Sequence, residues 1–228
     1  MRFSAGHDLS RLRIENAAAA LSSSGALCVD AFEKKLRDNA TSPTQVSNHL
    51  SEARVGLMFV ASGSQVTMRE SPELMIELVG ELFYAEVKRF LRKGQDTLDE
   101  LAERNARALF VRVGDTFPTE KREPWEQIAD VALKKRNQYV VGAANILVID
   151  SDSEALEGMA LSGANGYDAE VRRSPDDAAL RRLNGIMIIN VCQSISVQYG
   201  NVDFAVTRYP SRRMSAALEI ALRKIRFG

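Results

Sequence analysis

The most informative segment of the sequence is SPELMIELVGELFYAEVK, which spans residues 71–88. Apolar and polar residues alternate on both sides of Gly80, and this period of two is typical of β-strands with one buried face. A two-residue type II′ turn at Gly80-Glu81 would join the two halves as a hairpin. One face of that hairpin is then entirely apolar, and it carries Leu74, Ile76, Leu78, Phe83, Ala85 and Val87.

The opposite face of the predicted hairpin brings acidic side chains together. The register sets Glu73 across from Lys88 and beside Glu86. Carboxylate oxygens suit Mg²⁺ or Mn²⁺, and a lysine beside such an ion can orient or activate a water molecule. This face therefore indicates a divalent metal site with hydrolytic chemistry. Its full set of residues is Glu73, Met75, Glu77, Leu82, Tyr84, Glu86 and Lys88.

Helices and strands alternate on both sides of the hairpin. Ser42, Pro43 and Gln45 match a capping box with proline at the first helical position, which predicts a helix over 43–61 that ends at Gly63. We expect further helices over 9–21, 29–39, 97–109 and 124–138, from Ser153 to a turn at 163–166, from Ser174, and over 211–227. We expect further strands over 65–68, 110–113, 145–150, 185–191 and 202–207. This pattern predicts an α/β domain with a mixed sheet over residues 42–228, preceded by an N-terminal helical extension over residues 1–41.

The composition limits the classes of function. The 228 residues include 30 basic and 30 acidic side chains, so a polyanion would be held by local patches. His7 and His49 are the only histidines, while Cys28 and Cys192 lie far apart in the sequence. These counts do not favour a His-ligated metal, a His-based triad or a disulfide framework. No apolar run approaches the roughly 18 residues of a membrane helix, and the first thirty residues lack a signal-peptide pattern, so we expect a cytoplasmic protein without membrane segments.

The motifs resemble those of the PD-(D/E)XK nuclease superfamily. Pro72-Glu73 begins one strand and Glu86-Val87-Lys88 lies on the next, although Glu73 stands where the superfamily usually has Asp. Glu52 is similar in position to the acidic residue of that superfamily's first core helix. Lys135 to Gln138, before the 145–150 strand, resembles its Lys-x-x-Gln pattern. The order helix, three strands, helix, strand resembles the αβββαβ restriction-endonuclease-like core and covers about a hundred of the 228 residues.

The resemblance implies a set of roles for these residues. Glu73, Glu86 and the backbone carbonyl of Val87 would bind Mg²⁺ or Mn²⁺. Lys88 would handle the attacking water, and Glu52 would support the metal or a water. The implied activity is that of an endonuclease hydrolysing phosphodiester bonds, with DNA as the expected substrate and a homodimer as the arrangement that cuts both strands.

Basic residues near these motifs are candidates for contacts with phosphates. They are Arg89, Arg92, Lys93, Lys135 and, as a polar neighbour, Gln138. Glu and Lys on exposed strands also form ordinary cross-strand ion pairs, so a Glu-x-Lys motif alone does not define a site. Two alternatives stay open: a catalytically inactive member that binds nucleic acid or protein, and a protein-interaction component of a defence or mobile-element system.

Overall fold

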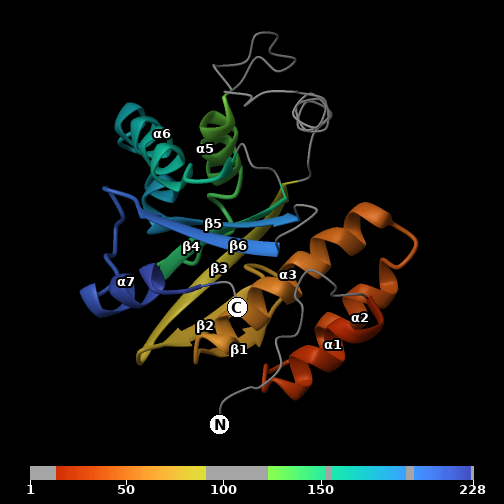
Figure 1. Cartoon of the computed structure of the whole chain (residues 1–228). Coiled ribbons are helices and arrows are strands. Elements are labelled where there is room, and N and C mark those ends of the chain that lie inside the picture. The colour runs from red at the N-terminus through yellow and green to blue at the C-terminus, as the bar shows by residue number, and fades with distance from the viewer. Residues whose placement is uncertain (1–13, 91–122, 153–155, 194–197, 227–228) are drawn as a thin grey trace.

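A computed structural model of the chain describes residues 14–90, 123–152, 156–193 and 198–226. Their strands form one mixed sheet of six strands in sequence order (Figure 1). β1, β2 and β3 are antiparallel, β3, β4 and β5 run parallel, and β6 is antiparallel to β5. The strands are β1 (Gln65–Met68), β2 (Leu74–Leu78), β3 (Glu81–Phe90), β4 (Ala144–Ser151), β5 (Gly185–Gln193) and β6 (Gln198–Val206). The predicted α/β class with a mixed sheet is confirmed.

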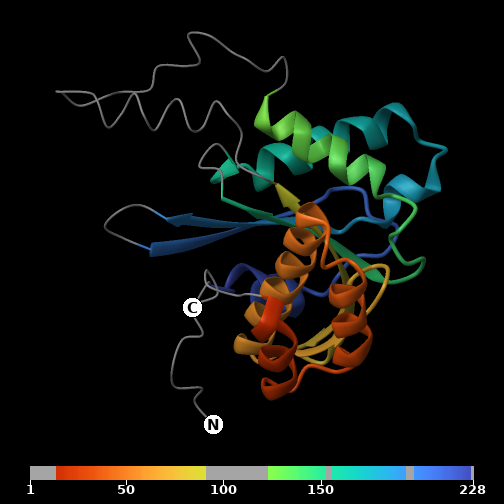
Figure 2. The same ribbon diagram turned by 90° about the vertical axis from the view of Figure 1, so that its right-hand side faces the viewer.

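Helices cover both faces of the sheet (Figures 1 and 2). On one face, α1 (Ile14–Ser23), α2 (Val29–Asp38), α3 (Pro43–Ala61) and α7 (Ala216–Arg223) enclose one apolar core. On the other face, α5 (Pro124–Lys134), α6 (Ala160–Arg173) and a 3₁₀ helix (Ala178–Arg182) enclose a second. β4 is buried along its whole length between these layers, as its continuous apolar run predicts. Among the described helices, none combines the length and apolar character needed to cross a membrane.

The N-terminal helices are joined to the sheet rather than set apart from it. Leu27, between α1 and α2, bridges in parallel to Thr67 in β1. The Leu27 amide donates to Val66 O at 2.8 Å, and the Met68 amide donates to Leu27 O at 2.9 Å. Both helices bury side chains in the same core as α3, so residues 14–38 and the sheet share their packing.

The hairpin has the predicted faces but a different turn. Leu78 pairs with Glu81, so the turn residues are Val79 and Gly80, with φ of 50° and 75°. Two positive φ angles define a type I′ turn, and the predicted II′ turn at Gly80-Glu81 was wrong. The change shifts the pairing by two residues, which keeps every side chain on its face. The register next to the Leu74 and Ala85 pair places Glu73 across from Glu86 instead of Lys88.

Several helix boundaries differ from the predicted ones. α3 has the predicted bounds, but the side chain of its N-cap, Ser42, makes no capping hydrogen bond. α5 ends at Lys134, because the chain turns there and buries Tyr139, whose hydroxyl donates to Ala132 O at 3.1 Å. Lys135 is therefore the C-cap, and Gln138 lies in the turn that follows, outside the helix. The predicted helix over 97–109 and strand over 110–113 lie outside the described residues.

The predicted turn at 163–166 is instead the middle of α6. A Cβ at Gly163 would lie 2.4 Å from Cγ2 of Ile128, and a Cβ at Gly166 would lie 2.9 Å from the ring of Trp125. Both contacts are with α5. The two glycines therefore serve close packing of α5 against α6, and not a change of chain direction.

We expect Gly163→Ala to lower the free energy of unfolding by roughly 1–3 kcal/mol, because the new methyl group overlaps a buried isoleucine. Urea denaturation would measure the change. Ser162→Ala, one position earlier on the exposed side of α6, is the matched control and should be close to neutral. Equal stability of the two variants would show that α5 and α6 are not in this contact.

Candidate functional site

Two buried carboxyl groups form the centre of the candidate site. Glu73 precedes β2 and Glu86 lies within β3, and their exposed fractions are 9% and 1%. The Val87 amide donates to Oε2 of Glu73 at 2.9 Å. The alternation of β3 turns Glu86 away from the core that contains Ala85 and Val87, toward the layer of α5 and α6.

The proximity of these carboxyl groups changes the protonation of Glu73. Burial, followed by the charge of Glu86 and a hydrogen bond with it, raises the pKa of Glu73 from its ordinary 4.5 to about 8. The Val87 amide lowers that pKa and the charge of Glu52 raises it slightly, but burial and Glu86 outweigh the amide. Glu73 is therefore largely protonated at neutral pH.

Glu86 is also paired with a lysine from the helical layer. Nζ of Lys135, at the end of α5, donates to Oε1 of Glu86. Oε2 of Glu86 is buried and, apart from the neighbouring Glu73 carboxyl group, has no hydrogen-bonding partner among the described residues. The buried ring of Tyr139 lies close enough for Glu86 and Glu73 to contribute to raising its pKa. One oxygen of Glu86 thus stays available for a cation or for the proton of Glu73.

Glu52 lies within electrostatic range of Glu73, but its own carboxylate is already engaged. Lys35 Nζ in α2 donates to Oε2 of Glu52 at 2.9 Å, and His49 Nδ1 lies 3.0 Å from Oε1. The predicted acidic residue of the first core helix is thus present and buried, but it is paired with its own partners. The spacing of three between His49 and Glu52 could have indicated their contact, whereas Lys35 comes from a separate helix.

Lys88 lies on the same face of β3 as Glu86, roughly 7 Å further along the strand. It is half-buried and makes no ion pair with a described side chain. Lys135 is therefore the lysine that contacts the carboxyl pair. The sequence predicts it instead as a contact to phosphate. The Val87 amide contacts Glu73, and its carbonyl remains a predicted ligand only.

The charges of this cluster balance without a bound cation. Glu52 is paired with Lys35 and Glu86 with Lys135, while Glu73 is largely protonated at neutral pH. In the described part of the chain, no three His, Cys, Asp or Glu side chains are already arranged around one metal position. A cation would therefore need to displace the Glu73 proton and an existing ion pair.

A second cluster of charged residues lies on the α3 side of the sheet and was not predicted. Asp150, at the end of β4, is fully buried and accepts from Nη1 of Arg54 at 2.8 and 2.9 Å. Arg89 Nη1 donates to the same carboxylate at 3.2 Å, and the Ser51 hydroxyl also donates to it. This cluster fixes α3 to β3 and β4. Arg89 is engaged internally, which does not favour its predicted contact with phosphate.

The remaining predicted contacts to nucleic acid are Arg92, Lys93 and Gln138. Arg92 and Lys93 lie outside the described residues. Gln138 is exposed in the turn after α5. Of the five predicted residues, the structure describes three, and among these Lys135 is the one that contacts Glu86.

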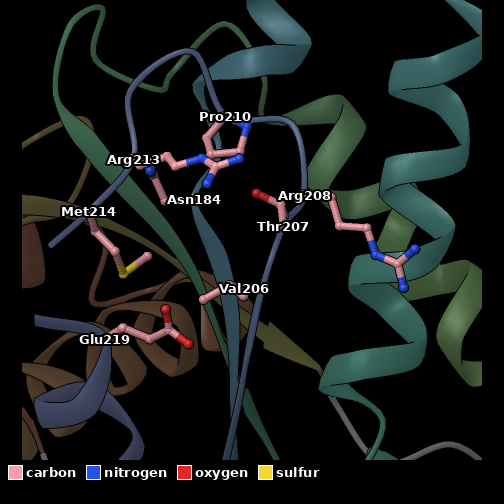
Figure 3. Close-up of a pocket in the computed structure, with 8 residues that line it drawn as sticks. All are labelled: Asn184, Val206, Thr207, Arg208, Pro210, Arg213, Met214 and Glu219. Carbon is pink, nitrogen blue, oxygen red and sulfur yellow. The ribbon is translucent and has the colours of Figure 1, made fainter. Parts of the chain in front are cut away.

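A cavity of about 330 Å³ lies elsewhere, between the start of β5, the end of β6 and α7 (Figure 3). Its polar walls are largely occupied by internal hydrogen bonds: Asn184 bonds to Asn145 and Arg212, and the Thr207 hydroxyl donates to Leu183 O. Arg208 points away from the other labelled arginine toward α6. The cavity is lined by Asn184, Val206, Thr207, Arg208, Pro210, Arg213, Met214 and Glu219, none of which belongs to the carboxyl site.

The fold and site define an α/β protein with a mixed sheet and a buried pair of carboxyl groups, one directly before β2 and the other within β3. Comparison with protein-family models, curated proteins and solved structures finds no match for the chain.

The raised pKa of Glu73 predicts a specific dependence of stability on pH. Between about pH 5 and 8 the folded chain keeps the Glu73 proton that the unfolded chain has released. Stability should therefore fall as pH rises through this range, by at most about 1.4 kcal/mol per pH unit from this group. Urea denaturation at several pH values would measure the slope.

Glu73→Gln keeps the shape of the protonated group but cannot titrate, so we expect this part of the slope to disappear. Glu77→Gln, which changes an exposed carboxylate on the same strand face, is the control and should keep the parent slope. An identical slope in Glu73→Gln and the parent would mean that Glu73 is ionised in the folded chain.

Proposed function

We propose that this chain is a divalent-metal-dependent endonuclease with a restriction-endonuclease-like core, which hydrolyses phosphodiester bonds in DNA. The observation that carries the proposal is the buried pair of Glu73 and Glu86, with Oε2 of Glu86 lacking a described hydrogen-bonding partner apart from Glu73. Hard divalent cations such as Mg²⁺ and Mn²⁺ prefer such oxygens.

The order of elements supports the same proposal. α3 precedes the antiparallel strands β1, β2 and β3, and α5 precedes β4, which runs parallel to β3. Among the described elements, this order agrees with the αβββαβ order that the resemblance implies. Glu73 directly precedes β2, Glu86 lies in β3, and the helix before β1 carries Glu52.

In this proposal Glu73, Glu86 and the Val87 carbonyl hold the cation. The bound ion would supply a water of lowered pKa and would offset negative charge on the phosphate. Glu73 would lose its proton on binding the ion, Lys88 would orient the water, and Glu52, beside Lys35, would support the metal or a water. The full set of proposed functional residues is thus Glu52, Glu73, Glu86, Val87 and Lys88.

Cleavage of both strands of a DNA duplex needs two such centres. Each chain supplies one carboxyl pair, so a dimer with twofold symmetry is the arrangement that we propose for a double-strand cut.

A second candidate function is a catalytically inactive protein of the same fold that binds nucleic acid or another protein. The charge balance of the cluster favours it, because the carboxyl groups are neutralised by lysines and a proton without any cation. Glu instead of Asp at position 73 favours it as well. Mn²⁺ calorimetry separates the two functions, since this alternative predicts no metal binding and retained affinity for its partner.

We expect the parent to cut plasmid or oligonucleotide DNA in the presence of Mg²⁺ or Mn²⁺, and Glu86→Gln and Lys88→Ala to lose at least about 100-fold in rate. Loss of groups that merely support metal ligands already costs about 10- to 100-fold. Glu77→Gln is the control with the same change of side chain at an exposed position on the neighbouring strand, and it should cut at the parent rate. The site is assigned wrongly if Glu86→Gln and Lys88→Ala both cut as fast as the parent.

A further inference from the structure

The side chains of Lys135 and Glu86, which form an ion pair, differ in how freely they can move. Glu86 projects from the middle of β3 and its side chain is fully buried, whereas the Lys135 side chain is 24% exposed at the end of α5. A lysine side chain has a long flexible stem and can extend its ammonium group into water. Of the two partners, Lys135 is therefore the one that can leave the contact.

We infer that Lys135 is a built-in competitor for the cation site: it neutralises Glu86 in the metal-free protein and is displaced when a divalent cation binds. This inference rests on the proposed metal site. It adds that the affinity for the cation is set by the strength of an internal ion pair as well as by the ligands themselves.

Repulsion between like charges explains why the Lys135 ammonium group and a divalent cation would not bind Glu86 at the same time. An ammonium group on Oε1 and a divalent ion on Oε2 would lie within a few ångströms of each other in a buried site, where like charges repel strongly. Glu52 does not supply a further free carboxylate, because it is already paired with Lys35 and His49.

The residues around the pair support a specific role for Lys135. Lys88 makes no ion pair with a described side chain, so it can stay in place when a cation binds. Lys134, the preceding residue, is exposed and, unlike Lys135, makes no ion pair with Glu86. Lys135 therefore opposes binding of the cation. Its neighbour Lys134 offers a control in which substitution causes the same change of net charge.

The test is isothermal titration of Mn²⁺ at pH 8.5 into the metal-free parent, Lys135→Gln, Lys134→Gln, Lys135→Arg and Glu86→Gln. We expect Lys135→Gln to bind Mn²⁺ about 10-fold more tightly, because the metal-free state loses the ion pair that neutralises Glu86. Lys134→Gln should match the parent. Lys135→Arg keeps the competing charge and should also stay near the parent affinity. Urea denaturation of each metal-free variant would establish that it is folded.

The outcomes separate this inference from the proposed function. If Glu86→Gln binds Mn²⁺ as tightly as the parent, the proposed metal site is wrong. If Glu86→Gln loses binding while Lys135→Gln binds equally or more weakly than the parent, the metal site stands and the competitor role of Lys135 is overturned. A gain in Lys135→Arg as large as that in Lys135→Gln would also overturn it, because the competing charge is still present.

Discussion

The arrangement of the candidate site follows from the burial of two carboxyl groups side by side. Two negative charges this close in a low-dielectric environment are unfavourable, so at least one must be neutralised. The protein uses a proton on Glu73 and the ammonium group of Lys135 on Glu86. The same requirement explains why Glu52 has its own lysine, since it adds a third carboxylate nearby.

Both faces of the sheet contribute to this neutralisation. Lys135 comes from the layer of α5 and α6, while Lys35 and His49 come from α2 and α3 on the other side. The Asp150 cluster holds α3 against β3 and β4 through Arg54 and Arg89. The positions of the carboxyl groups are therefore coupled to the packing of helices that are distant in the sequence.

The sequence predicts those features that depend on neighbouring residues. The bounds of α3 follow from Pro43 at its start and Gly63 after its end, and the faces of the hairpin follow from its alternation. The turn type does not follow, because Gly80 fits either the first position of a II′ turn or the second of an I′ turn. Sequence alone likewise cannot distinguish glycines that turn the chain from glycines that let two helices touch, as Gly163 does.

The ion pairs of the site could not be predicted, because they join elements brought together only by tertiary packing. Glu86 and Lys135 are 49 residues apart, and Ser51 and Asp150 are 99 apart. Strand alternation predicts that Glu73 and Glu86 lie close together. It also predicts Lys88 as the lysine beside them, whereas Lys135 makes that contact in the structure. The shift of two residues in the hairpin and the early end of α5 account for that difference.

The close fit between α5 and α6 has a mechanical consequence. Because Gly163 and Gly166 carry no side chain, the side chains of Ile128 and Trp125 pack directly against the backbone of α6. Helices α5 and α6 should then move together as one rigid body, with little sliding or tilting of one helix on the other. Any rearrangement at the Lys135 end must come from rotation of that side chain about its own bonds, on the nanosecond scale of rotamer changes, and need not wait for a slower shift of the helix.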